Sequence, residues 1–231
     1  MSWHIIGEQH PHPHEFLSDV ILGLNDGIVT TLVFVLSVSG VSRSDRSISL
    51  AGIAEMLAGG VSMFLGAYMS ARTEREVKQH QIAVERHEIE HEPEEEREEL
   101  RQIYREKGFS GRQLAGIVNH LTSDPDRWLN SMVRDELLLR PGEFRSPWEV
   151  GTIVGGSFAG GALLPIIPFL LSVPNGQVWA VALTLAVLFA TGAARSRYSH
   201  RSLLRSSVEM VVIGAVGTIA GLVIGRLLAA R

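Results

Sequence analysis

An uncharged stretch of 45 residues, Val150 to Ala194, constrains this chain more than any other feature of its sequence. Its one strong break is Pro174-Asn175-Gly176, a combination typical of turns. The break leaves two segments of about 20 residues, the length that a helix needs to cross about 30 Å of hydrocarbon. The stretch therefore predicts a transmembrane hairpin.

Three further segments have the length and composition of spans: Ser18 to Gly40, Ile48 to Ala71, and Ser206 to Gly225. The region from Arg72 to Pro147 differs, because it holds 17 Asp or Glu and 13 Lys or Arg and must lie in water. A mean hydropathy of +0.16 fits such an uneven chain. The sequence predicts an all-α polytopic membrane protein with five transmembrane helices and a helical insert between the second and the third.

The chain accordingly divides into four parts: a histidine-containing tail (1–17), the first two spans (18–71), the acidic insert (72–147) and spans three to five (148–231). The loop after the fourth span is rich in arginine, whereas the loop after the third has no basic residue. Because basic loops stay in the cytoplasm, the amino terminus and the insert are predicted to be cytoplasmic and the carboxyl terminus to lie outside. The arginines in question are Arg195, Arg197, Arg201 and Arg205.

Several classes of function are disfavoured. The chain has no cysteine, which excludes disulfides, thiolate metal sites and cysteine nucleophiles. It shows no paired nucleophile and base, no phosphate-binding loop, and no basic surface suited to nucleic acid. We expect neither an enzyme nor a resident cofactor. No cleavable signal peptide is evident in residues 1–17.

Glu55 lies inside the second span, where a charge is costly and therefore suggests a function. On a helix it shares one face with Met63 and with three glycines, since these residues follow at steps of three and four. The glycines are Gly52, Gly59 and Gly66. Two interpretations remain open: close packing of helices against a polar group, or a conduction path with Glu55 as an ion or proton site.

Asp26 lies in the first span between Asn25 and Gly27, a triplet that also occurs in turns. If the helix began only at Ile28, about 14 residues would remain before Val41, too few to cross a bilayer. The helix is therefore predicted to include Asp26. Two spans with an acid each favour a divalent cation site or a proton relay.

In the insert, the second helix is predicted to continue to about Glu92, and Pro93 to start a new helix. Glu85 and Glu88 lie on one face of the first arm, and Glu96 and Glu99 repeat this spacing on the second. If the arms fold back, these carboxylates converge into a divalent metal site, and the nearby His87 and His91 favour a transition metal. The alternative is a solvated helix whose glutamates pair with Arg86, Arg97 and Arg101.

Four motifs together resemble the vacuolar iron transporter family, and its bacterial members in particular. They are NDGIV in the first span, AEMLAGGVSMFLGAYMSARTE in the second, E-x-x-E followed by P-x-x-E-x-x-E, and MVRDEL. The resemblance covers residues 15 to 228. It implies a five-helix exchanger of Fe²⁺ or similar metals for protons with a cytoplasmic metal-binding domain, a homodimer with its path between subunits near the first two helices.

Carried over to this sequence, the resemblance assigns Asp26, Glu55 and Met63 to the membrane path. It assigns the metal site of the insert to Glu85, Glu88, Glu96, Glu99, Met132 and Glu136. Glu136 and Met132 are predicted by the resemblance alone. Val133 stands where some members have a second methionine.

The sequence thus predicts export of Fe²⁺, or also Mn²⁺, from the cytoplasm in exchange for protons, across the inner membrane of a bacterium. The partners are metal ions, protons and the lipid bilayer. The alternatives are a membrane-anchored metal sensor, which needs the glutamates but not Asp26, and a cation channel without proton coupling. The tail residues His4, His10, His12 and His14 are either a metal-capture segment or inert.

Overall fold

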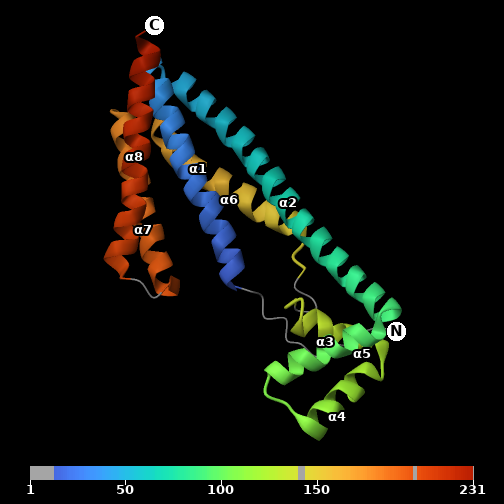
Figure 1. Ribbon diagram of the computed structural model, residues 1–231. Coiled ribbons are helices and arrows are strands. Elements are labelled where there is room, and N and C mark those ends of the chain that lie inside the picture. Colours follow the sequence, from blue (N-terminus) through green and yellow to red (C-terminus); the bar gives the residue numbers. More distant parts are fainter. Residues whose placement is uncertain (1–12, 140–143, 200–201, 231) are drawn as a thin grey trace. The chain divides into compact units, whose positions relative to one another are not determined.

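The computed structural model describes residues 13–139, 144–199 and 202–230, and every regular element in these ranges is an α-helix (Figure 1). The chain forms two compact units. One contains residues 1–68 and 147–231, and the other contains residues 69–146. The tail residues His4, His10 and His12 lie outside the described ranges.

The first unit contains α1 (Pro13–Val41), α6 (Pro147–Leu170), α7 (Gly176–Ser199), α8 (Leu203–Ala229) and the first half of α2 (Asp45–His91). Within it α1 packs against α6 and α8, and α7 packs against α8 and α6. All five helices are long and apolar enough to cross a membrane. The five predicted spans are thereby confirmed, and the chain is an integral membrane protein.

Local sequence signals behave as their chemistry requires. Asp26 lies within α1 and not at a turn. Asn175 adopts a left-handed conformation with φ of 58°, which asparagine tolerates well, and α7 begins at the next residue. Pro165 and Pro168 lie inside α6 without ending it, as membrane helices permit when neighbouring groups satisfy the freed backbone.

Glycine brings α1 and α6 into close contact. A Cβ atom on Gly27 would lie 2.1 Å from the carbonyl oxygen of Phe158, and one on Gly161 would lie 2.3 Å from that of Leu24. No side chain fits at either point, so both glycines are required for this approach. Phe158, which is buried, lies at this contact, close to the middle of α1.

The membrane half of α2 is the least covered of the spans that the structure describes, with 17% of its most apolar window buried. Leu50, Leu57, Val61 and Leu65 are each more than half exposed. In a membrane protein such a surface contacts lipid or another protein chain. The rings of Tyr68 and Trp148 meet at 5.1 Å near the end of this apolar segment, as aromatic residues do at membrane interfaces.

The second unit contains the remainder of α2 together with α3 (Pro93–Glu106), α4 (Gly111–Thr122) and α5 (Pro125–Asp135). The predicted break is confirmed, because α2 ends at His91 and Pro93 opens α3. The start of α5 is capped by Asp124, whose side chain accepts a hydrogen bond from the Arg127 amide at 2.8 Å. The apolar core of this unit is formed by Ile89, Leu100, Leu114, Val118, Trp128, Leu129, Met132 and Val133.

Candidate metal sites in the two units

The first site lies where α1 meets the membrane half of α2. Glu55 is half-buried on α2, and its Oε2 atom accepts a hydrogen bond from Oγ1 of Thr31 at 2.5 Å. Thr31 lies on α1 and is fully buried. One turn beyond Glu55, a Cβ on Gly59 would lie 2.4 Å from the Phe158 ring and 3.4 Å from Glu55 Oε1. Gly59 thus leaves room for both the ring and the carboxylate.

Asp26 is exposed on α1, and its Oδ1 atom accepts a hydrogen bond from Thr30 at 3.3 Å. It lies near enough to Glu55 for the two charges to interact. Asp26 also lines a cavity of about 590 Å³ between α1, α7 and α8, together with Asn25 and Met210. The structure therefore brings together the two acids expected on the membrane path.

Met63, the third expected path residue, lies half-buried on α2 two turns beyond Glu55. Eight helical residues rise by about 12 Å. Met63 is therefore not part of the contact between Thr31 and Glu55. It lies at a separate point farther along the helix.

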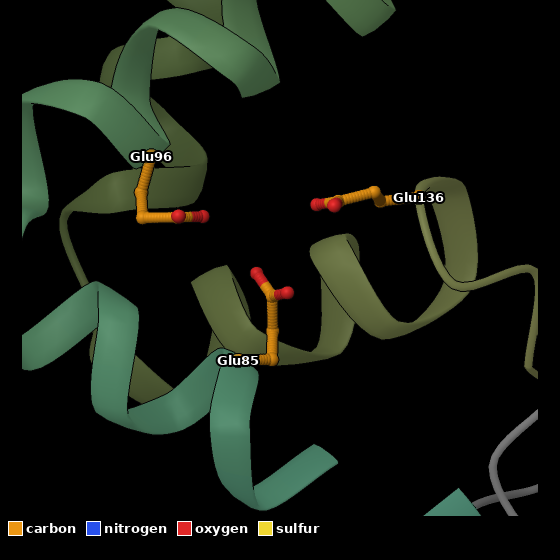
Figure 2. Close-up of side chains that lie close together, drawn as sticks. All are labelled: Glu85, Glu96 and Glu136. Atoms are coloured by element: carbon orange, nitrogen blue, oxygen red, sulfur yellow. The ribbon is translucent and has the colours of Figure 1, made fainter. Parts of the chain in front are cut away.

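The second site lies within the unit formed by residues 69–146. Glu85 on α2, Glu96 on α3 and Glu136 at the carboxyl end of α5 each turn a carboxylate toward the same point (Figure 2). One oxygen from each of the three lies within 4.8 Å of the others. Glu85 is 2% exposed and Glu96 is 6% exposed, so two of these acids are buried. Three converging carboxylates are the oxygen-rich set that divalent cations bind.

The electrostatics of this cluster favour a bound cation. Burial, followed by the charges of Glu136 and Glu96, raises the pKa of Glu85 to about 8. Burial and then the charge of Glu99 raise the pKa of Glu96 to about 7, and burial also raises the pKa of Glu136. Oε1 of Glu85 and Oε2 of Glu96 are buried without a hydrogen-bond partner among the described residues. A divalent ion would satisfy both atoms and relieve the repulsion.

Glu88 and Glu99 stand at the edge of this cluster, near enough that their charges act on Glu136. Met132 lies differently, because its side chain is fully buried in the apolar core of the unit. The backbone of α5 links the two regions, since the Glu136 amide donates to the Met132 carbonyl oxygen at 2.8 Å.

The alternative interpretation, a salt-bridged solvated helix, describes other glutamates of the same run. Arg97 pairs with Glu94 at 3.4 Å, and Arg101 pairs with Glu98. Both are pairs within α3 and use its exposed face. The acidic run therefore divides into a solvated face that pairs with arginine and a buried face that contributes Glu96 to the cluster.

A polar contact fixes the end of α5 beside this cluster. Asp135 accepts a hydrogen bond from the Tyr104 hydroxyl at 2.9 Å and is paired with Lys107, both at the end of α3. Although burial opposes it, these partners hold the pKa of Asp135 below its usual range. The neighbouring acids Asp135 and Glu136 thus differ in kind: the first is held by cationic and hydroxyl groups, and the second faces other carboxylates.

The helical spacing of acids in the sequence predicts four glutamates of the insert but does not indicate Glu136. That residue is 40 positions beyond Glu96 and has no acidic partner at helical spacing on α5. Only its place in the MVRDEL motif indicated it. Nothing in the sequence indicates that the hydroxyl of Thr31 reaches Glu55.

The fold and the two sites define an integral membrane protein that carries acidic groups both within its spans and in a separate helical unit. The chain belongs to the VIT family, whose sequence profile matches residues 17–226. The family resemblance inferred from the motifs is thereby confirmed.

Named relatives cover most of the chain. Vacuolar iron transporter 1 of Arabidopsis thaliana is 30% identical over 222 residues, which span 95% of this chain and 88% of that protein. Vacuolar iron transporter 2 of Oryza sativa subsp. japonica is 30% identical over 216 residues, spanning 92% and 87%. Protein CCC1 of Saccharomyces cerevisiae is 29% identical over 212 residues, spanning 87% and 65%.

Proposed function

We propose that this protein exports a divalent transition metal, Fe²⁺ in the first instance and Mn²⁺ as a second substrate, from the cytoplasm in exchange for protons. The observation that carries the proposal is the pair of acids in the apolar spans, Asp26 and Glu55, whose charges interact. Acids are expensive inside a bilayer and mark ion or proton pathways there. The names of the relatives, which are iron transporters, support iron as the substrate.

The cluster of Glu85, Glu96 and Glu136 is proposed to collect the metal before transport. Its unpartnered buried oxygens and raised pKa values support this role. Since a metal must displace the protons held by these carboxylates, its affinity rises with pH. Collection is therefore strongest at neutral to alkaline pH and weak below about pH 5.

Exchange then follows from competition at Asp26 and Glu55. Protonating a carboxylate removes its charge and weakens its hold on the cation, so a proton arriving from the opposite side releases the metal. Met63, two turns along α2, offers a thioether to the departing ion. Thioethers favour transition metals over Mg²⁺, which prefers oxygen ligands and loses its water reluctantly.

Topology and assembly complete the proposal. The insert and the amino terminus lie in the cytoplasm and the carboxyl terminus outside, consistent with the arginines between the fourth and fifth spans. The protein works as a homodimer in the inner membrane of a bacterium. The exposed apolar side chains on α2 supply a surface that a second copy can cover.

Metal uptake into proteoliposomes tests this function. The parent protein should load Fe²⁺, whereas Asp26→Asn and Glu55→Gln should each reduce the initial rate by about 100-fold or more, because the fixed charge is lost. Glu209→Gln is the control, since that acid lies at the start of α8 and pairs with Arg205 at 3.6 Å, and it should transport at the parent rate. Transport by both pathway variants at the parent rate would exclude this pathway, and retained metal binding without any flux would favour the sensor.

A further inference from the structure

The side chains of Thr30 and Thr31 depart from the usual behaviour of hydroxyl residues in membrane helices. A threonine in a helix commonly donates its hydroxyl to the carbonyl oxygen one turn earlier. Thr191 and Thr218 do so, at 2.9 Å and 2.8 Å. Thr30 and Thr31 instead give their hydroxyls to carboxylates: Thr30 to Asp26 within α1, and Thr31 to Glu55 across to α2.

The contact of Thr31 is the shorter and the better protected of the two. Its hydroxyl lies 2.5 Å from Glu55 Oε2, whereas that of Thr30 lies 3.3 Å from Asp26. Thr31 is fully buried, so water does not compete for its single hydrogen. A short hydroxyl–carboxylate bond is among the strong hydrogen bonds of proteins, and a dry surrounding strengthens it further.

The surroundings of Glu55 restrict its carboxylate from the other side as well. A methyl group at Gly59 would lie 3.4 Å from Oε1 and would overlap the Phe158 ring at 2.4 Å. The carboxylate is therefore set between the hydroxyl of Thr31, which occupies Oε2, and the bare backbone of Gly59. Among the described residues, no hydrogen bond to Oε1 accompanies the one that Thr31 makes to Oε2.

We propose that Thr31 is a positioning residue of the transport path, which holds Glu55 by Oε2 so that Oε1 is presented to the metal. The inference rests on the proposed function, which assigns no role to Thr31. A carboxylate already held in its binding orientation loses less rotational freedom when the ion arrives. Thr31 therefore lowers the metal concentration needed for half-maximal transport and leaves the maximal rate largely unchanged.

The test compares Thr31→Val, which replaces the hydroxyl by a methyl group of similar size, with Thr31→Ser, which keeps the hydroxyl. We expect Thr31→Val to raise KM for Fe²⁺ about fivefold to tenfold, with Vmax within about twofold of the parent. Thr31→Ser should restore KM to near the parent value. Thr218→Val is the matched control, because that hydroxyl bonds to its own helix, and it should leave both parameters unchanged.

An unchanged or lowered KM in Thr31→Val would overturn the proposal. Equal impairment in Thr31→Ser would overturn it too, because the effect would then come from packing and not from the hydroxyl. Thr31→Ala serves the same comparison if the valine variant does not fold.

Infrared difference spectroscopy gives a readout that does not depend on transport. The band of the protonated Glu55 carboxyl, assigned by its loss in Glu55→Gln, should move to higher frequency in Thr31→Val and stay in place in Thr31→Ser. An unmoved band in the valine variant contradicts the contact itself. Failure of the parent protein to carry Fe²⁺ would instead contradict the proposed function, and the infrared result would still decide the role of Thr31.

Discussion

The position of the Glu55 carboxylate depends on two neighbouring residues. Its carboxylate lies between a buried hydroxyl on α1 and a glycine on its own helix. Neither neighbour is acidic, and neither would bind metal strongly alone. They determine instead which oxygen of the carboxylate is held and how much room it has.

Gly59 gives a prediction at this scale. We expect Gly59→Ala to destabilise the protein by about 1–3 kcal/mol, because the added methyl overlaps the Phe158 ring and touches Glu55. Thermal unfolding in detergent measures the loss, and Fe²⁺ uptake should fall with it. Gly66→Ala on the same helix is the control, since nothing lies within 4 Å of its added Cβ, and it should be neutral or slightly stabilising. Equal stability of both variants would contradict the packing described here.

Glu85 and Glu96 make the stability of the metal-free protein depend on pH. Their pKa values, about 8 and about 7, lie above the ordinary value of a glutamate in an unfolded chain, so the folded state holds more protons. The free energy of unfolding is then highest below about pH 4.5 and falls as pH rises toward 8, by about 1.4 kcal/mol for each unit by which a pKa is raised. Thermal unfolding of residues 69–146 within the full protein, with a chelator present, should show this decline.

Two variants and added metal, studied in the same experiment, test whether the buried glutamates cause this decline in stability. Glu85→Gln should flatten the decline, because one of the titrating groups is gone, while Glu94→Gln on the exposed face of α3 should leave it as in the parent. Added Mn²⁺ should restore stability at pH 8, where the carboxylates are free to bind it. Metal-free stability that rises from pH 5 to pH 8 would show that these acids are not coupled as the structure places them.

At the scale of helices, the sequence predicts the spans well and the insert only in part. The length of the apolar segments predicts the spans, because a chain in lipid must satisfy its backbone hydrogen bonds within a helix. The same length requirement predicts that Asp26 lies inside α1, as it does. Pro93 fixes the break after α2 for an equally local reason. The meeting of Glu136 with Glu85 and Glu96 depends instead on how α5 packs, which no local pattern encodes.

The hydrogen bond between Tyr104 and Asp135 joins the end of α5 to α3. Tyr104→Phe removes the hydroxyl that donates to Asp135 at 2.9 Å and should cost about 1–2 kcal/mol in the stability of the insert. Because Glu136 follows Asp135 directly, Mn²⁺ affinity should fall as well. The control is Glu98→Gln, which breaks only exposed pairs with Arg101 and Arg105 and should change stability by less than about 0.5 kcal/mol. A phenylalanine variant with parent stability would show that this contact does not secure α5.

At the scale of the whole molecule, each unit has its own packed interior and its own acidic site. Substitutions in separate cores that share no partner usually act independently. We therefore expect Asp26→Asn and Glu55→Gln to abolish transport while the insert binds Mn²⁺ with the parent affinity. Calorimetric titration of the purified variants measures this, and a loss of affinity greater than about tenfold would show that the two sites are one linked system.

Exchange of metal for protons is tested most directly by simultaneous recording of Fe²⁺ entry and lumenal pH in proteoliposomes whose interior is more acidic than the medium. For an exchanger, we expect metal to enter faster as the gradient steepens and lumenal pH to rise with each increment of metal. Metal entry that ignores the gradient and leaves lumenal pH unchanged would contradict exchange and identify an uncoupled channel.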